Sequence, residues 1–225
     1  MHTAQSIITA DGSHTLYVPH LNEHYHSTSG AIAEARHVYV ETGYLFARQH
    51  FNPVSVLEVG FGTGLNCLLT MLEAEGDNLV VHYTGVELYP LDQELLEALN
   101  YPRCLAPHDA SVWWNRIHRE AEWNVPLSFP HGASLLKWHG DIMGFPLPEA
   151  PFHLVCFDAF APEVQPALWT AEAFRRVADM MVKGGVLVTY SSKGAVRRAM
   201  EIAGFDVQKV PGPGKKREIV RAIKR

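Results

Sequence analysis

Hydrophobic residues along the chain fall into two kinds of segment, short apolar runs and longer stripes with helical spacing. The apolar runs predict buried strands at residues 54–59, 79–87, 132–142, 152–158, 186–190, 205–210 and 218–223. The stripes predict helices at residues 65–73, 90–100, 111–124, 167–182 and 193–203. Strands that alternate with helices in this way predict an α/β fold built on a mostly parallel sheet.

The N-terminal segment has a different pattern and precedes the main series of strands. Residues 6–18 predict a β-hairpin with its turn at Asp11-Gly12. Residues 31–49 predict a helix that Thr42-Gly43 interrupts. We therefore expect residues 1–50 to form an extension packed on a main domain of residues 51–225.

A polar and aromatic loop at residues 21–27 joins the predicted hairpin to the helix and contains Tyr25. Side chains of this kind suit a loop that covers a cofactor or contacts a substrate. Several histidines lie nearby, but no cysteine or carboxylate pattern completes a metal-ligand set around them. No metal site is therefore expected.

The clearest chemical signal is a glycine turn between the first buried strand and its helix. Gly60, Gly62 and Gly64 there let the backbone approach a ligand closely. Glu58 precedes the turn, and Glu87 ends the next strand about 20 residues later, where an acid can accept hydrogen bonds from ribose hydroxyls. This spacing favours S-adenosylmethionine, which has no pyrophosphate to bind. An NAD(P) cofactor and a tight turn without a ligand are the alternatives.

Later strand ends carry further polar side chains. Ligands of open parallel sheets bind beyond the carboxyl ends of the strands, so Asp158 is expected to face the same crevice as the glycine turn. Asp141, followed by the apolar Ile142, is a candidate contact for an adenine amino group, and a plain loop aspartate is the alternative. Tyr190 ends the next strand and is expected to line the same pocket.

Composition limits the class of protein. A length of 225 residues suits one domain with a small appendage. The three cysteines have no C-x-x-C spacing, which favours free thiols in a reducing compartment. No run of about 18 apolar residues is present, and the first residues do not resemble a signal peptide. We expect a cytoplasmic protein without a membrane span.

Charge is distributed unevenly. Residues 193–225 hold ten Lys and Arg against three acids, a local net charge of +7, whereas the whole chain carries −5. A basic end on an acidic body suggests contact with a polyanion. A solvated surface helix with a frayed tail is the equally weighted alternative.

Six segments together resemble the MnmC methyltransferase family, at residues 11–13, 25–27, 58–66, 157–162, 189–198 and 211–218. Phe-Gly-Thr-Gly-Leu-Asn at residues 61–66 and Asp-Ala-Phe-Ala-Pro at residues 158–162 are the most specific of them. The resemblance implies a class I S-adenosylmethionine-dependent methyltransferase fold. This fold is Rossmann-like, with a mostly parallel seven-stranded sheet and an antiparallel last strand.

The resemblance also implies a reaction and its residues. The enzyme would methylate the 5-aminomethyl(-2-thio)uridine at the tRNA wobble position, giving 5-methylaminomethyl(-2-thio)uridine. Catalysis is expected at Asp158 and Tyr190. Cofactor contacts are expected at Tyr25, Glu58, Gly60, Gly62, Gly64, Asn66, Glu87, Asp141, Ile142 and Asp158. Candidate tRNA contacts are Lys193, Arg197, Arg198, Lys215, Lys216 and Arg217.

In the familiar bifunctional members an FAD-dependent oxidase domain follows the methyltransferase domain. This chain ends at Arg225 without a second glycine-rich motif, so neither FAD nor oxidase activity is expected. The expected partners are tRNA and enzymes that act earlier on the wobble uridine, and a monomer is expected. The alternatives are a methyltransferase or aminopropyltransferase-like enzyme on a small amine, and a non-catalytic S-adenosylmethionine-binding protein associated with RNA.

Overall fold

A computed structural model describes residues 4–106, 109–214 and 217–225 of the chain. Its strands are β1 (Gln5–Ile8), β2 (His14–Val18), β3 (Glu23–His24), β4 (Val54–Val59), β5 (Val81–Glu87), β6 (Leu127–Ser128), β7 (Ser134–His139), β8 (Phe152–Phe157), β9 (Met181–Thr189), β10 (Phe205–Pro211) and β11 (Glu218–Lys224). Its α-helices are α1 (Ala31–Ala35), α2 (Leu45–Ala47), α3 (Leu65–Gly76), α4 (Gln93–Glu97), α5 (Tyr101–Cys104), α6 (Ala110–Asn115), α7 (Ala171–Asp179) and α8 (Gly194–Ile202). Five further helical segments are η1 (Arg36–Tyr44) and η2 (Arg116–Glu120), which are π-helical, and the 3₁₀ turns η3 (Pro130–Gly132), η4 (Ile142–Gly144) and η5 (Pro166–Trp169).

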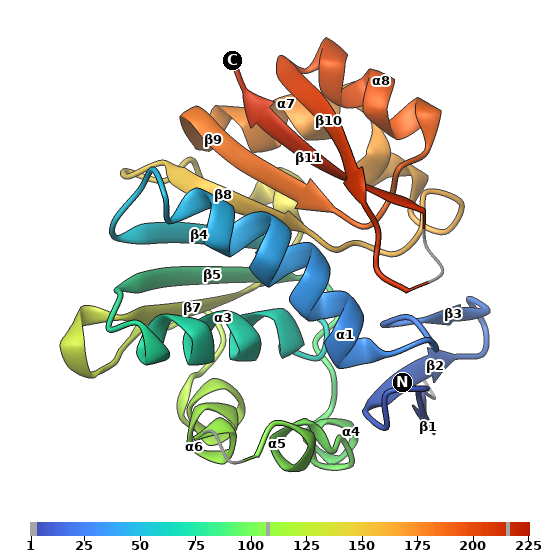
Figure 1. Ribbon diagram of the computed structural model, residues 1–225, viewed down its shortest axis with the longest axis vertical. Helices are drawn as coiled ribbons and strands as arrows, with labels where there is room; N and C mark the ends of the chain where they lie inside the picture. The colour runs from blue at the N-terminus through green and yellow to red at the C-terminus, as the bar shows by residue number, and fades with distance from the viewer. Residues whose placement is uncertain (1–3, 107–108, 215–216) are drawn as a thin grey trace.

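One large sheet forms the centre of the molecule (Figure 1). Its strand order is β10-β11-β9-β8-β4-β5-β7-β6. The five strands from β9 to β7 pair in parallel, and β11 pairs antiparallel with both β9 and β10. The expected α/β class and its antiparallel closing pair are confirmed. The two-residue strand β6 adds an eighth, antiparallel strand beside β7.

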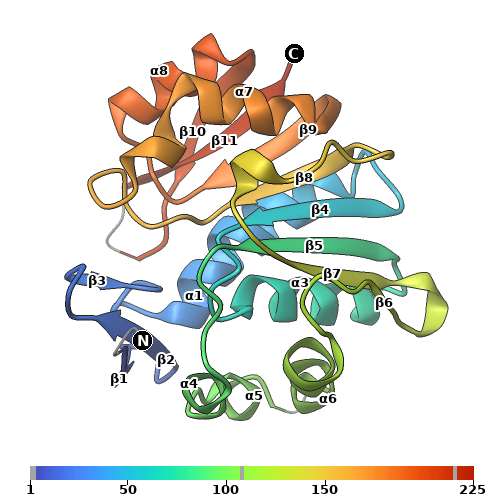
Figure 2. The ribbon, with the colours of Figure 1, turned by 180° about the vertical axis from the view of Figure 1, so that it is seen from behind.

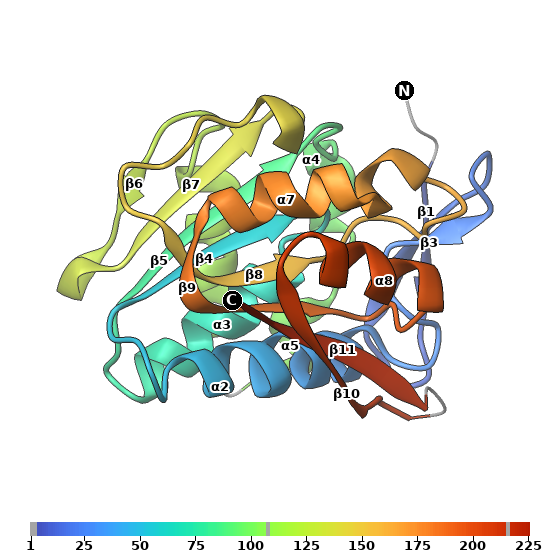
Figure 3. The ribbon, with the colours of Figure 1, turned by 90° about the horizontal axis from the view of Figure 1, so that it is seen from above.

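Helices cover both faces of the sheet (Figure 3). Successive strand residues point to opposite faces, so each buried strand contributes to two separate clusters. Leu154 and Cys156 of β8 pack in the cluster that includes the 31–47 helical run and α3. Val155 and Phe157 of the same strand pack in the cluster with α7 and α8. Burial on both faces explains why these strands are continuous apolar runs in the sequence.

The N-terminal residues form a second, three-stranded sheet of order β1-β2-β3. The predicted hairpin is present, with Gln5 opposite Tyr17 and Ile8 opposite His14. Residues expected to be a loop supply the additional strand β3, which pairs with β2. This small sheet lies at the end of the main sheet where the parallel strands finish (Figure 2).

Three local predictions were wrong. Thr42-Gly43 does not interrupt the helix, because both residues lie inside η1, where Gly43 packs closely against Val188 of the sheet. The helix predicted at residues 90–100 is shorter, since α4 ends at Glu97, and Tyr101-Pro102 begins the separate helix α5, because proline is tolerated in a first helical turn. The helix predicted at residues 167–182 ends at Asp179 in α7, and residues 181–185 belong to β9, where Met181 pairs with Phe152 beside a register irregularity.

Candidate active site

The glycine turn lies where β4 meets α3, and its backbone requires glycine. Gly60, Gly62 and Gly64 have φ values of +87°, +51° and +72°. A Cβ on Gly60 would lie 2.5 Å from the backbone oxygen of Asp158. The turn and the end of β8 are therefore in direct contact, although 98 positions separate Gly60 from Asp158 in the sequence.

A cavity of about 910 Å³ opens beyond the carboxyl ends of β4, β5 and β8. Residues 20–28 of the N-terminal segment form one wall, so the expectation that this segment covers a site agrees with its position. Of the residues predicted from the sequence, the cavity brings together Tyr25, Gly60, Gly62, Glu87, Asp141, Ile142, Asp158 and Tyr190.

Glu87 is fixed at the cavity wall by backbone donors. Its Oε2 accepts a hydrogen bond from the Gly62 N–H at 2.9 Å, and its Oε1 accepts one from the Tyr89 N–H at 2.9 Å. The carboxylate thus ties the glycine turn to the loop after β5. Carboxylate oxygens can accept more than one hydrogen bond each, so this side chain can still receive ligand hydroxyls.

Asp141 and Ile142 follow the end of β7 and line the same cavity as Glu87. The Asp141 Oδ1 accepts a hydrogen bond from the Met143 N–H at 2.9 Å and so caps the 3₁₀ turn η4. Ile142 is buried, whereas Asp141 is exposed. Asp141 and Ile142 thus place a hydrogen-bond acceptor beside an apolar side chain at the cavity wall.

Three predicted cofactor contacts do not line the cavity in the described structure. Glu58 is 0 % exposed, and its oxygens accept hydrogen bonds from Asn66 Nδ2 at 2.7 Å and from the Tyr83 hydroxyl at 2.9 Å. Burial, and then the charge of Asp158, raise the pKa of Glu58 well above its usual range. Gly64 precedes α3 and packs against the His118 ring. Glu58, Asn66 and Gly64 therefore support the site from beneath.

Asp158 is half-buried at the end of β8 and is held by two side chains. Its Oδ1 accepts a hydrogen bond from the Tyr39 hydroxyl, and its Oδ2 accepts one from Asn66 Nδ2. Asn66 thus connects Asp158 to the buried Glu58. Sequence reasoning missed Tyr39, because within a helical stripe it looks like any other core aromatic.

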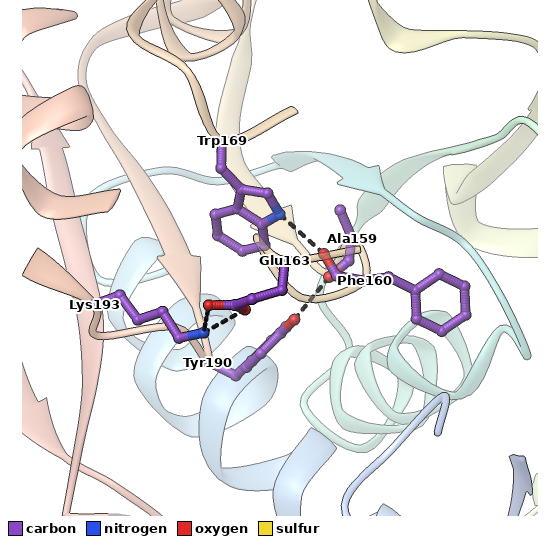
Figure 4. Close-up of polar contacts among 6 residues, drawn as sticks. All are labelled: Ala159, Phe160, Glu163, Trp169, Tyr190 and Lys193. Carbon is purple, nitrogen blue, oxygen red and sulfur yellow. Dashed lines mark hydrogen bonds and ion pairs between the residues drawn. The ribbon is translucent and has the colours of Figure 1, made fainter. Parts of the chain in front are cut away.

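The loop that follows Asp158 is anchored by two side chains (Figure 4). The Tyr190 hydroxyl donates to the Ala159 oxygen, and the Trp169 indole N–H donates to the Phe160 oxygen, each at 2.9 Å. The Phe160 ring points away from both anchors and meets Tyr25 edge-on with ring centres 5.0 Å apart. Tyr190 therefore holds the cavity wall, and Phe160 was another residue that the sequence did not single out.

The charge of the cavity is one-sided. Five carboxylic acids line it, and within the described ranges neither Lys nor Arg does. The acids are Glu23, Glu34, Glu87, Asp141 and Asp158. Glu34 was not predicted; it reaches the wall from α1, and its Oε2 accepts the Ser27 N–H at 2.8 Å. Such a lining favours a positively charged ligand.

His26 lines the cavity from the N-terminal segment and is buried there. The His26 ring lies within hydrogen-bond distance of the Thr63 hydroxyl at 2.9 Å, inside the glycine turn. Burial lowers the pKa of His26 to about 4. The described residues contain no group of three or more His, Cys, Asp or Glu placed to hold a metal ion.

The predicted tRNA contacts that the structure describes lie outside the cavity wall. Lys193 forms an ion pair with Glu163 (Figure 4), and Arg197 donates to the Ser192 oxygen at 3.3 Å. Arg217 and Arg197 both act electrostatically on Glu218 of β11. Arg198 is exposed on α8. Lys215 and Lys216 lie outside the described residues.

In the part of the chain that the structure describes, no helix could span a membrane.

Comparisons with known proteins agree with this architecture. A family model described as S-adenosyl-L-methionine-dependent methyltransferase matches residues 113–225. The tRNA 5-methylaminomethyl-2-thiouridine biosynthesis bifunctional protein MnmC of Magnetococcus marinus is 30% identical over 93% of this chain and 32% of the relative. The protein of the same name from Aeromonas salmonicida is 35% identical over 85% of this chain and 31% of the relative. The chain thus spans about a third of the length of these curated relatives.

Solved structures share the fold. The crystal structure of MNMC2 from Aquifex aeolicus superposes with a TM-score of 0.81 at 23% identity, covering 100% of this chain and 71% of that one. Magnesium protoporphyrin IX methyltransferase from Synechocystis, solved with bound SAH, gives 0.51 at 10% identity, covering 87% and 85%. The glycine turn, the acidic cavity and the family match lead to one conclusion: the chain belongs to the S-adenosyl-L-methionine-dependent methyltransferase family.

Proposed function

We propose that this chain transfers a methyl group from S-adenosylmethionine to the 5-aminomethyl(-2-thio)uridine at the wobble position of tRNA. The observation that carries the proposal is the placement of Asp158 in one acidic cavity with the glycine turn. The choice of acceptor rests on the relatives, whose name specifies tRNA 5-methylaminomethyl-2-thiouridine biosynthesis.

The cavity fits the cofactor in shape and charge. Side chains at Gly60 or Gly62 would fill space beside Asp158 and Tyr25, so glycine keeps this wall open. Glu87 is proposed to accept the ribose hydroxyls, and Asp141 with Ile142 to hold the adenine. Tyr25, Gly60 and Gly62 complete the contacts, and Glu58, Gly64 and Asn66 support them.

In this reaction the main task of the protein is to align the substrate amine with the methyl group of the cofactor. The bound cofactor supplies an activated methyl group on a sulfonium, so the chain has to orient an amine lone pair toward it. An aliphatic amine is mostly protonated at neutral pH, as lysine is. Asp158 is proposed to accept a hydrogen bond from this nitrogen, to orient it, and to receive or relay the proton that leaves it. Tyr190 keeps the Asp158 loop in place.

Methyl transfer from a sulfonium to an amine changes no oxidation state, so we propose that this reaction uses neither FAD nor a metal ion. We also propose that residues 1–50 act as an extension that walls the cavity, since residues 20–28 line it. We further propose that the enzyme is a monomer in the cytoplasm. It would act after the enzymes that modify the wobble uridine earlier.

Asp158→Ala tests the catalytic assignment. We expect it to remove most turnover on tRNA while the Kd for S-adenosylmethionine, measured by titration calorimetry, stays within a few-fold of wild type. Glu122→Ala, at an exposed position, is the matched control. A fully active Asp158→Ala variant would overturn the assignment.

The acidic lining also favours a second candidate, methyl transfer to a small amine. Equal concentrations of aminomethyl-bearing tRNA and of small primary amines distinguish the two in one competition assay. The proposed function predicts label in the RNA. Label in the free amine alone would favour the second candidate.

A further inference from the structure

Asp158 is held by donors from two elements that lie far apart in the sequence. The Tyr39 hydroxyl of η1 donates to Oδ1 at 2.5 Å, and Asn66 Nδ2 of α3 donates to Oδ2 at 2.8 Å. The Asp158 N–H also donates to the Val59 oxygen at 2.8 Å. One donor on each carboxylate oxygen fixes the plane of the group as well as its position.

Tyr39 lies in a helix of an unusual kind. Tyr39 and Tyr44 are five residues apart, which is the hydrogen-bonding interval of a π-helix, and both are buried. Gly43 brings this helix against the sheet, since a Cβ there would lie 2.9 Å from Val188 Cγ2. Single π-helical segments occur frequently at functional sites.

Asp158 also interacts electrostatically with groups from several other elements. The charge of Asp158 raises the pKa of Glu58, Cys156 and Tyr190, although burial is the larger cause for each. Glu34 acts electrostatically on Tyr39 and Tyr190 from α1. Nearby acids act against a negative charge at this position, and the hydrogen bonds from Tyr39 and Asn66 oppose that effect.

We propose that Tyr39 is a positioning residue, whose hydroxyl sets the orientation in which Asp158 receives the substrate amine. The inference rests on the proposed function. Tyr39 is 1% exposed and is absent from the cavity wall in the described structure, so it acts through Asp158 and not on the substrate. Burial, together with Asp158, raises the pKa of Tyr39 well above its usual range, which keeps the hydroxyl a donor.

Tyr39→Phe removes the donor and keeps the ring. A hydrogen bond to a charged group is lost, so we expect kcat on aminomethyl-bearing tRNA to fall about ten-fold. The Kd for S-adenosylmethionine and the thermal midpoint should stay near wild type, because the cavity wall is unchanged. Tyr44→Phe is the matched control, since its hydroxyl is buried in the same helical run but lies beside Arg48.

Proton NMR tests the same hydrogen bond without the Tyr39→Phe variant, in case that variant folds poorly. The hydroxyl proton shared with Asp158 should give a downfield proton NMR signal in wild type and in Tyr44→Phe. Asp158→Asn should shift or remove this signal. A signal that Asp158→Asn leaves unchanged would overturn the inference.

The kinetic outcomes separate this inference from the proposed function. An active wild type with Tyr39→Phe within two-fold of its kcat overturns the positioning role and leaves the function intact. If kcat falls but the affinity for S-adenosylmethionine and the thermal midpoint fall as well, the positioning role is also overturned, and Tyr39 has a structural role instead. A wild type that methylates no tRNA overturns the proposed function itself.

Discussion

The acids predicted at the strand ends do not all line the cavity. Glu87 and Asp158 follow the expectation that strand-end acids face the cavity. Glu58 does not, because strand residues alternate between faces and Glu58 shares its face with Val56, beneath the helices on that side. Its partners Asn66 and Tyr83 come from neighbouring elements, so only the folded packing determines that this acid is buried.

Glu87→Ala tests the cofactor assignment at a single residue. The change removes the proposed acceptor of the ribose hydroxyls and both hydrogen bonds that tie Gly62 and Tyr89 together. We expect the Kd for S-adenosylmethionine, measured by titration calorimetry, to rise about ten-fold or more. Glu94→Ala, at an exposed position on α4, is the control. Unchanged affinity in Glu87→Ala would contradict the assignment.

Two buried histidines give stability a pH dependence. Burial lowers the pKa of His26 to about 4 and, with a smaller effect of Lys137, lowers that of His118 to about 3. Unfolded histidine titrates near about 6.5, so between these values the unfolded chain binds protons that the folded chain does not. Their contribution to stability is therefore present above pH 6.5 and is lost as the pH falls toward 4.

Urea unfolding at pH 7.5 and pH 5 measures this effect. We expect a lower free energy of unfolding at pH 5. His118→Gln should reduce the difference between the two pH values, because one of the two proton-binding sites of the unfolded chain is gone. Equal stability of the wild type at both pH values would argue against buried neutral histidines.

At the scale of elements, periodicity predicted the strands of the main sheet other than the two-residue β6, and most helices, because burial on both faces leaves long apolar runs. It did not predict that residues 31–47 form one helical run, since Gly43 resembles a helix breaker when its neighbours are unknown. The reason for glycine there is contact with Val188, which is 145 positions away in the sequence. A close approach of this kind leaves no local signal.

Gly43→Ala tests whether this contact sets the position of the helix. The new Cβ would lie 2.9 Å from Val188 Cγ2 and 3.3 Å from Leu154 Cδ1, both within the packed core. We expect a loss of about 1–3 kcal/mol in the free energy of unfolding. We also expect a lower kcat, because Tyr39 lies one helical turn away.

Gly76→Ala is the matched control, since a Cβ at this helical position meets nothing within 4 Å. It should change stability by less than about 1 kcal/mol. A Gly43→Ala variant as stable and active as Gly76→Ala would show that the helix can move away from the sheet without consequence.

Across the whole molecule, the sequence predicted that distant motifs meet at one end of the sheet, because parallel strands all finish there. It could not predict that Tyr39 bonds Asp158 across 119 positions, which depends on how the helix packs. Three cations of the basic C-terminal region are already paired with acids in the folded chain. Lys193, Lys209 and Arg225 form surface ion pairs with Glu163, Glu218 and Asp206.

The remaining basic side chains are the better test of RNA contact. We expect the Arg197→Ala, Arg198→Ala, Arg217→Ala triple variant to bind tRNA more weakly. Its plot of log Kobs against log salt should be shallower by about 0.7–0.9 per lost phosphate contact. The control replaces three exposed cations elsewhere with Ala, namely Arg103, Arg175 and Lys183. Equal slopes for the two triple variants would place the RNA surface elsewhere.

The identity of the methylated nucleoside tests the central claim most directly. The purified chain is incubated with methyl-labelled S-adenosylmethionine and tRNA from cells that lack the methyltransferase, and the RNA is digested and its labelled nucleoside identified. The proposed function predicts label in 5-methylaminomethyl-type uridine. Label in any other nucleoside, or cofactor binding without label in tRNA, would contradict it.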